Sequence, residues 1–103
     1  MKQVMVRYRV LPERVAENEE LIREVYRELA DTDPEGLRYA TFRLEDGVSF
    51  MHLAETDDER NPLPELAAFK RFQANIRERC EEPPVVTELS EVGAYRLFGA
   101  SPS

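Results

Sequence analysis

His52 is the residue of this sequence best suited to acid–base chemistry. It is the only histidine among the 103 residues, and in an alternating run it shares a side with Phe50 and Ala54. An imidazole with an ordinary pKa of about 6.5 changes charge near neutrality, so His52 is a candidate general base. A half-buried histidine bonded to a neighbour would show the same pattern, and this structural role is the alternative.

Three arginines lie inside extended patterns: Arg7, Arg9 and Arg43. A guanidinium in a sheet must reach an anion or water. We therefore take Arg9 and Arg43 as candidate catalytic residues that would stabilise an anionic substrate by electrostatic preorganisation. The alternative for each is a salt bridge to one of the many carboxylates, or a place at the margin of the sheet.

Candidate ligand-binding residues surround these positions. Tyr39 and Thr41 share a side with Arg43 and are suited to donate hydrogen bonds to the same ligand, although tyrosine is also common at dimer interfaces. Phe50 shares the side of His52. Phe69 and Phe72 are first of all core residues of a helix, with lining of a pocket as their second role.

Other chemical sites are not indicated. The acidic pairs at 57–58 and 81–82 have neither a nearby histidine nor the spacing of a calcium loop, so they read as solvated charge. Cys80 falls on an apolar stripe, as a buried structural thiol does. No glycine-rich phosphate loop, zinc-ligand spacing or nucleophile elbow occurs. We expect no metal and no cofactor.

Composition narrows the partners and the compartment. A chain of 103 residues makes one domain, and its net charge of −7 argues against nucleic acid and an anionic membrane as partners. The single cysteine excludes an intramolecular disulfide. The apolar start is interrupted by Arg7 and Arg9, which is typical of a strand and not of a signal peptide. The expected location is the cytoplasm.

The elements that must position the candidate residues follow from periodicity. Residues 3–11 alternate, with Val4, Val6, Tyr8 and Val10 on one side. Residues 13–31 form an amphipathic helix whose apolar stripe includes Asn18. Further elements are predicted as follows: a loop at 31–36, strands at 37–45 and 48–56 joined by a two-residue turn at Asp46-Gly47, a helix at 63–80, and a strand at 85–98 broken near Gly93.

This order predicts one α+β domain of ferredoxin-like βαββαβ type over residues 1–99, with residues 100–103 as a frayed tail. Both helices of such a unit cover one face of the antiparallel sheet. The other face also carries apolar residues, so we expect a second copy of the chain to cover it. The sequence leaves two orientations for the strand at 48–56, because a shift of one residue in register exchanges His52 for Met51 or Leu53 on the side that faces the helices.

Element order, length, the run Phe50-Met51-His52-Leu53-Ala54-Glu55 and the run Ala68-Phe69-Lys70-Arg71-Phe72 together resemble the dimeric α+β barrel proteins. The similarity is greatest to the small antibiotic-biosynthesis-monooxygenase-like domains. This resemblance implies a homodimer whose two sheets form a barrel, each subunit keeping a cavity between sheet and helices for an apolar aromatic ligand. Some members oxygenate phenols or quinols without metal or flavin, and some degrade haem.

Two departures from the family pattern argue against haem degradation. The tryptophan that many members carry after the acidic residue of the third strand is Thr56 here, and the second predicted helix has no histidine. The leading expectation is a cofactor-independent monooxygenase-like protein that binds a phenol or quinol. His52 would take the phenolic proton, Arg9 or Arg43 would steady the anion, and Tyr39 would orient it. The alternative is a non-catalytic ligand-binding or assembly homodimer of the same fold.

Overall fold

A computed structural model describes residues 2–57 and 60–97 of the chain. Its principal elements, in chain order, are β1 (Lys2–Val10), α1 (Val15–Thr32), β2 (Leu37–Arg43), β3 (Ser49–Thr56), α2 (Ala67–Gln73), α3 (Ile76–Arg79) and β4 (Cys80–Leu89). Single 3₁₀ turns, η1 (Pro12–Arg14) and η2 (Leu63–Glu65), precede α1 and α2.

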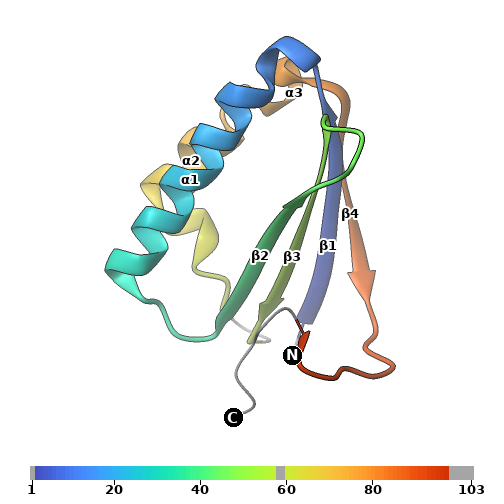
Figure 1. Cartoon of the computed structure of the whole chain (residues 1–103). Helices are drawn as coiled ribbons and strands as arrows, with labels where there is room; N and C mark the ends of the chain where they lie inside the picture. Colours follow the sequence, from blue (N-terminus) through green and yellow to red (C-terminus); the bar gives the residue numbers. More distant parts are fainter. Residues whose placement is uncertain (1, 58–59, 98–103) are drawn as a thin grey trace.

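The four strands form one antiparallel sheet in the order β2-β3-β1-β4. Figure 1 shows that α1 and α2 lie on the same side of this sheet. The two strands in the centre, β3 and β1, come from distant parts of the chain, and this is the strand order of a ferredoxin-like unit. The predicted α+β fold class is confirmed.

Strand register determines which side chains face the helices. Tyr8 pairs with Phe50, Val6 pairs with His52, and His52 pairs with Thr41 on the other side of β3. Directly paired residues point to the same face of a sheet. Because Tyr8 and Phe50 belong to the core under the helices, His52 faces the helices as well. The open question about the orientation of β3 is thereby answered.

The first helix is confirmed within two residues, since the predicted stretch begins with η1 and continues as α1. It ends at Asp33, whose φ of 42° is left-handed and whose N–H donates to the carbonyl of Leu29. Its buried residues are Asn18, Ile22 and Val25. Asn18 is fully buried, so the polar residue within the apolar stripe lies inside the protein.

The prediction of one continuous helix over residues 63–80 is wrong. Leu66 is extended between η2 and α2, and Asn75 has a left-handed φ of 62° between α2 and α3. The apolar spacing that predicted one helix is retained on both sides of the break, because Phe72 and Ile76 both reach the core. Periodicity records which residues are inward and does not detect one left-handed residue between them.

The prediction for the last strand is also wrong in its bounds. The strand runs over Cys80–Leu89 instead of 85–98, and Gly93 lies beyond it. Pro83 and Pro84 lie within β4. Proline is tolerated there because β4 is an edge strand, and its register with β1 shifts nearby, between Arg7 and Arg9. The end of the predicted strand at residue 98 and the predicted tail at 100–103 lie outside the described residues.

The turn between β2 and β3 is centred at Asp46-Gly47 as predicted, but it is not a two-residue turn. The ladder stops where the Leu44 N–H donates to the Ser49 carbonyl, and of the two central residues only Gly47 has a positive φ. The Asp46 carboxylate accepts hydrogen bonds from the N–H groups of Val48 and Ser49 and from the Ser49 hydroxyl, which stabilises the wider turn.

Within the described residues, no helix is long and apolar enough to cross a membrane.

Candidate functional site

A cavity of about 540 Å³ lies between the helix-facing side of the sheet and the segment that carries η2, α2 and α3. Its lining is mainly apolar. Aliphatic and aromatic side chains contribute from both layers, among them Val6, Ala54, Leu63, Phe69, Phe72 and Ile76. Polar side chains line it as well: Tyr8, Tyr39 and His52 from the sheet, together with Lys2, Thr56, Asp57, Arg60, Asn61 and Gln73. A mostly apolar cavity with a few convergent polar groups is the usual form of a small-molecule site.

His52 is held by hydroxyl groups at both ring nitrogens. Its Nε2 lies 2.8 Å from the Tyr8 Oη, and its Nδ1 lies 2.6 Å from the Tyr39 Oη and 3.1 Å from the Thr41 Oγ1. These partners come from β1 and β2, the two neighbours of β3, so the sheet itself brings the group together.

These contacts extend in both directions through the interior. On one side the Asn18 Nδ2 donates to the Tyr8 Oη at 3.0 Å, and the Arg79 Nε donates to the Asn18 Oδ1 at 3.2 Å. On the other side the Thr41 Oγ1 lies 2.8 Å from the Tyr26 Oη. We call the whole set the buried hydrogen-bond chain; its members are Arg79, Asn18, Tyr8, His52, Tyr39, Thr41 and Tyr26.

Burial keeps the central side chains of the buried hydrogen-bond chain, Tyr8, His52 and Tyr39, in their neutral forms. It lowers the pKa of His52 to about 4, so the imidazole is uncharged at neutral pH. Burial also raises the pKa of Tyr8 and of Tyr39 well above the ordinary value for a phenol. Both hydroxyls therefore keep their protons, and the cluster presents neutral hydrogen-bonding groups to the cavity.

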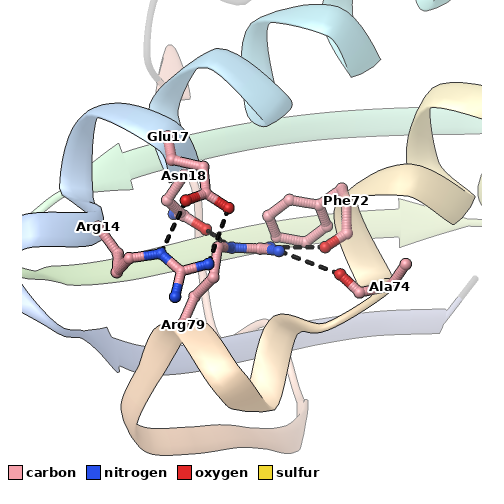
Figure 2. Close-up of polar contacts among 6 residues, drawn as sticks. All are labelled: Arg14, Glu17, Asn18, Phe72, Ala74 and Arg79. Atoms are coloured by element: carbon pink, nitrogen blue, oxygen red, sulfur yellow. Dashed lines mark hydrogen bonds and ion pairs between the residues drawn. The ribbon is translucent and has the colours of Figure 1, made fainter.

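Arg79 lies at one end of the buried hydrogen-bond chain, and Tyr26 lies at the opposite end. The Arg79 side chain is buried, and its Nη2 and Nη1 donate to the carbonyls of Phe72 at 2.6 Å and Ala74 at 3.1 Å (Figure 2). Its guanidinium also lies over the Phe72 ring. The two carbonyls belong to the end of α2, where helical partners run out, so Arg79 satisfies them. Burial lowers its pKa from the ordinary value.

Ring contacts fix the orientation of the hydroxyl-bearing side chains. Tyr8 stacks on Phe50 with 5.6 Å between ring centroids, and Tyr39 stacks on Tyr26 at 5.4 Å. The His52 ring lies 5.4 Å from that of Phe72. Such packing leaves the phenol oxygens little freedom to leave the imidazole.

Of the predicted site residues, the structure brings His52, Tyr39, Phe69 and Phe72 together on the cavity wall. Thr41 contacts His52 but is not among the lining residues. Phe50 is buried in the core, where it supports Tyr8.

The two predicted catalytic arginines lie elsewhere. Arg9 follows Tyr8 in β1 and therefore points to the opposite face, where it lies 3.5 Å from Glu81 and 4.0 Å from Glu82. The Arg43 Nη1 donates to Glu19 of α1 at 3.1 Å. Neither arginine is among the residues that line the cavity. The ion pairs that formed the alternative interpretation are present for both.

Sequence reasoning missed four members of the buried hydrogen-bond chain: Tyr8, Asn18, Tyr26 and Arg79. For Asn18 a signal existed, because it was the polar residue in the apolar stripe of α1. Tyr8 was placed on the helix-facing side of β1 without a role. For Arg79 a signal existed too, because it lies seven residues after Phe72 and three after Ile76 and so falls on the apolar stripe, whereas exposed Arg77 does not.

Among the described residues no three His, Cys, Asp or Glu side chains gather in a way that could hold a metal ion.

No protein-family model and no curated protein matches the chain. Solved structures do match over nearly the whole chain. The crystal structure of an antibiotic biosynthesis monooxygenase is 21% identical with a TM-score of 0.70, and the alignment covers 90% of this chain and 100% of that one.

Two further structures agree. SnoaB, a cofactor-independent oxygenase from Streptomyces nogalater, is 16% identical with a TM-score of 0.66, covering 90% of this chain and 94% of its own. Rv0793 from Mycobacterium tuberculosis is 17% identical with a TM-score of 0.67, and the alignment covers 90% of this chain and 96% of Rv0793. At identities this low, the structural similarity establishes the fold and does not establish the activity, which must be argued from the site. In its fold, the chain is an antibiotic-biosynthesis-monooxygenase-like α+β domain.

Proposed function

We propose that this protein binds a small, largely apolar aromatic compound of the phenol or quinol type in the cavity, and oxidises it with molecular oxygen without a cofactor. One observation carries the proposal: an apolar cavity of about 540 Å³ has a neutral Tyr8–His52–Tyr39 cluster in its wall. The volume and lining suit a ligand of one or two fused rings, and the cluster suits a single oxygen atom on that ligand.

The side chains of the cavity would act mainly on the charge of the substrate. A phenol becomes easier to oxidise when its oxygen carries negative charge, and a preorganised donor in a dry site stabilises such charge. Lys2 and Arg60 are the cations among the lining residues, and Tyr39 is a lining donor whose hydroxyl is held by His52. We assign it the role first given to the arginines, since Arg9 and Arg43 do not line the cavity.

His52 acts through Tyr39 in this proposal. A buried imidazole with a pKa near 4 is a weak base at neutral pH, and both of its nitrogens are already engaged by hydroxyl groups. Its part is to hold the hydroxyl of Tyr39 in place. The role of His52 as direct acceptor of the phenolic proton is the competing assignment within the same function.

The reaction is balanced with oxygen alone. When a phenol such as 1-naphthol is converted to the 1,4-quinone, the substrate gives up the hydrogens of the hydroxyl group and of the opposite ring carbon together with the electrons that reduce O₂. One oxygen atom enters the ring and the other leaves as water. No external reductant is needed, as for SnoaB, a cofactor-independent oxygenase.

The test is oxygen uptake with 1-naphthol, with the product identified by mass spectrometry under labelled O₂. We expect the quinone to carry one labelled oxygen, and Tyr39→Phe to reduce the rate by about tenfold or more, as loss of a transition-state hydrogen bond does. Arg23→Gln on the outer face of α1 is the control and should match the wild type. A rate equal to that without protein would refute the oxidation.

A second candidate is supported by the same neutral cluster. With His52 satisfied at both nitrogens and the arginines paired outside the cavity, the protein would be a binding homodimer without turnover. Binding of 1-naphthol without oxygen uptake is the result that this alternative predicts.

We further propose that the working form is a homodimer assembled through the sheet face opposite the helices. On that face a shallow hollow is lined by Met5, Arg7, Val85 and Thr87 among others, and Val85 is 62% exposed. An exposed apolar strand face of this kind is typically covered by another chain.

A further inference from the structure

The buried hydrogen-bond chain has a direction, and Arg79 determines it. A guanidinium has only donors, so the Asn18 atom that faces the Arg79 Nε at 3.2 Å must be the amide oxygen. The amide nitrogen of Asn18 is then the atom that faces the Tyr8 Oη at 3.0 Å. Because an amide nitrogen only donates, Tyr8 receives a hydrogen bond from Asn18.

The hydrogen of the Tyr8 hydroxyl must therefore go elsewhere. In the described part of the chain, the other partner of the Tyr8 oxygen is the His52 Nε2, at 2.8 Å. Tyr8 is only 2% exposed, and a buried hydroxyl without an acceptor costs about 1–3 kcal/mol. The arrangement that satisfies every group has Tyr8 donating to the His52 Nε2.

The tautomer of His52 follows. A neutral imidazole that accepts at Nε2 carries its proton on Nδ1. The Nδ1–H then donates to the Tyr39 oxygen at 2.6 Å, with the Thr41 oxygen at 3.1 Å as a second acceptor. Both hydroxyl hydrogens must turn away from the ring. The Thr41 hydroxyl has Tyr26 as a partner, and the Tyr39 hydroxyl has two directions open to it, toward Thr41 and toward the cavity that it lines.

We propose that Arg79, acting through Asn18 and Tyr8, is a positioning residue that fixes His52 as the Nδ1–H tautomer and directs the Tyr39 hydroxyl hydrogen to the ligand. The cavity then offers a hydrogen-bond donor at its polar wall. Its ligand is an aromatic compound with an acceptor oxygen, either a phenolate or a quinone carbonyl. The ligand class rests on the proposed function, while the tautomer does not.

Successive donation also strengthens the last donor. Each hydroxyl or ring that receives a hydrogen bond becomes a better donor itself, and this polarisation is greater in a low-dielectric interior. The series begins at a buried cation and passes through three neutral groups before it reaches Tyr39. Negative charge on a ligand oxygen next to Tyr39 is the charge that such a series stabilises best.

The tautomer is measured directly by ¹⁵N NMR of ligand-free protein labelled at histidine. His52 is the only histidine, so the spectrum contains a single imidazole and needs no assignment between residues. At neutral pH we expect Nδ1 to be the protonated, pyrrole-type nitrogen and Nε2 the pyridine-type nitrogen. A protonated Nε2 in the wild-type protein would overturn the proposal.

Asn18→Asp is designed to reverse the direction. A carboxylate pairs with Arg79 but cannot donate to Tyr8, so Tyr8 must donate to the carboxylate and accept from the His52 Nε2–H. We expect the proton to move from Nδ1 to Nε2, a change that loss of packing alone would not produce. Arg77→Gln on the exposed side of α3 should keep the Nδ1–H form. An unchanged tautomer in folded Asn18→Asp would contradict the role of Arg79; should that variant not fold, the wild-type spectrum still decides.

The ligand class is tested separately with two probes that share the same two-ring carbon skeleton, 1,4-naphthoquinone with carbonyl acceptors and naphthalene without them. One hydrogen bond is worth about five- to tenfold in affinity, so Tyr39→Phe should weaken quinone binding by that factor and leave naphthalene unchanged. Equal quinone affinity in both proteins would refute donation by Tyr39. Failure of both probes to bind would refute the proposed function, and the NMR result would still decide the tautomer.

Discussion

At the scale of single residues, the interior is organised by one imidazole and one guanidinium that are both buried. His52 is 4% exposed and Arg79 is 1% exposed, and hydrogen bonds through Asn18 and Tyr8 join them. Groups of this kind are tolerated inside a protein when their hydrogen bonds are satisfied and are costly when a partner is lost. Function and stability therefore depend on the same contacts.

Stability should fall in mild acid because of His52. Its pKa is about 4 in the folded protein and 6.5 when unfolded, so the unfolded chain binds the proton first as the pH falls. The stabilisation is complete above about pH 6.5 and is lost progressively down to about pH 4. The loss should amount to about 3 kcal/mol. Urea denaturation across this range, with His52→Gln as reference, measures it; parallel curves for the two proteins would contradict the assignment.

Arg79 should contribute far more to stability than its neighbour Arg77. In Arg79→Met the carbonyls of Phe72 and Ala74 and the Asn18 oxygen lose their donors, at a cost of about 3 kcal/mol in the free energy of unfolding. The matched variant Arg77→Met is exposed and should change stability by less than about 0.5 kcal/mol. Similar denaturation midpoints for the two variants would show that the contacts of Arg79 are not formed in solution.

At the scale of elements, the break between α2 and α3 does most to shape the site. The left-handed Asn75 ends α2, turns the chain, and places Arg79 where it reaches the interior. The cavity wall is formed by side chains from both sides of this break, such as Phe72 and Ile76. In a continuous helix Arg79 would share the face of Phe72 and Ile76, so the break changes how the side chain approaches the interior and not which side it is on.

Substitution of Asn75 tests the break. Glycine adopts a positive φ without strain, whereas alanine in this conformation costs about 1 kcal/mol or more. Asn75→Gly should therefore be at least as stable as wild type, and Asn75→Ala clearly less stable, by urea denaturation. In a continuous helix the order would be reversed, because alanine favours the helix interior over glycine by about 1 kcal/mol.

The sequence predicts the elements better than it predicts the site, and the reason is physical. Alternation in residues 3–11 and the turn centred at Asp46-Gly47 are local signals, and they gave β1 and the β2–β3 pairing correctly. The contact of Asn18 with Tyr8 joins two elements and depends on how α1 lies on the sheet. Phe69 and Phe72 were found because apolar spacing marks inward residues, whereas Arg79 lies at the same spacing but carries a charge, which is usually solvated.

At the scale of the whole molecule, one face of the sheet is covered by helices and the other is not (Figure 1). Residues 90–97 lie beyond β4 and also carry exposed apolar side chains, namely Val92, Tyr95 and Leu97. We propose that a second copy of the chain covers the uncovered face. The homodimer expected from the sequence thus stays our proposal for the assembled form.

Val85→Asp tests this assembly. Val85 pairs with Arg7 and is 62% exposed in the single chain, so a charge there should leave an isolated subunit folded. In a dimer through this face the charge would be buried without a partner, and the complex should dissociate. Light scattering after gel filtration should give a dimer for wild type and Arg23→Gln and a monomer for Val85→Asp. A monomeric wild-type protein would refute the proposed dimer.

The central claim is that the cavity binds an aromatic compound, and calorimetric titration with 1-naphthol tests it most directly. Ala54 lines the cavity, and Ala54→Phe should fill part of its volume of about 540 Å³. We predict one binding site per chain in the wild-type protein and no measurable binding in folded Ala54→Phe. Absence of binding to the wild type, or equal binding to both proteins, would contradict the account.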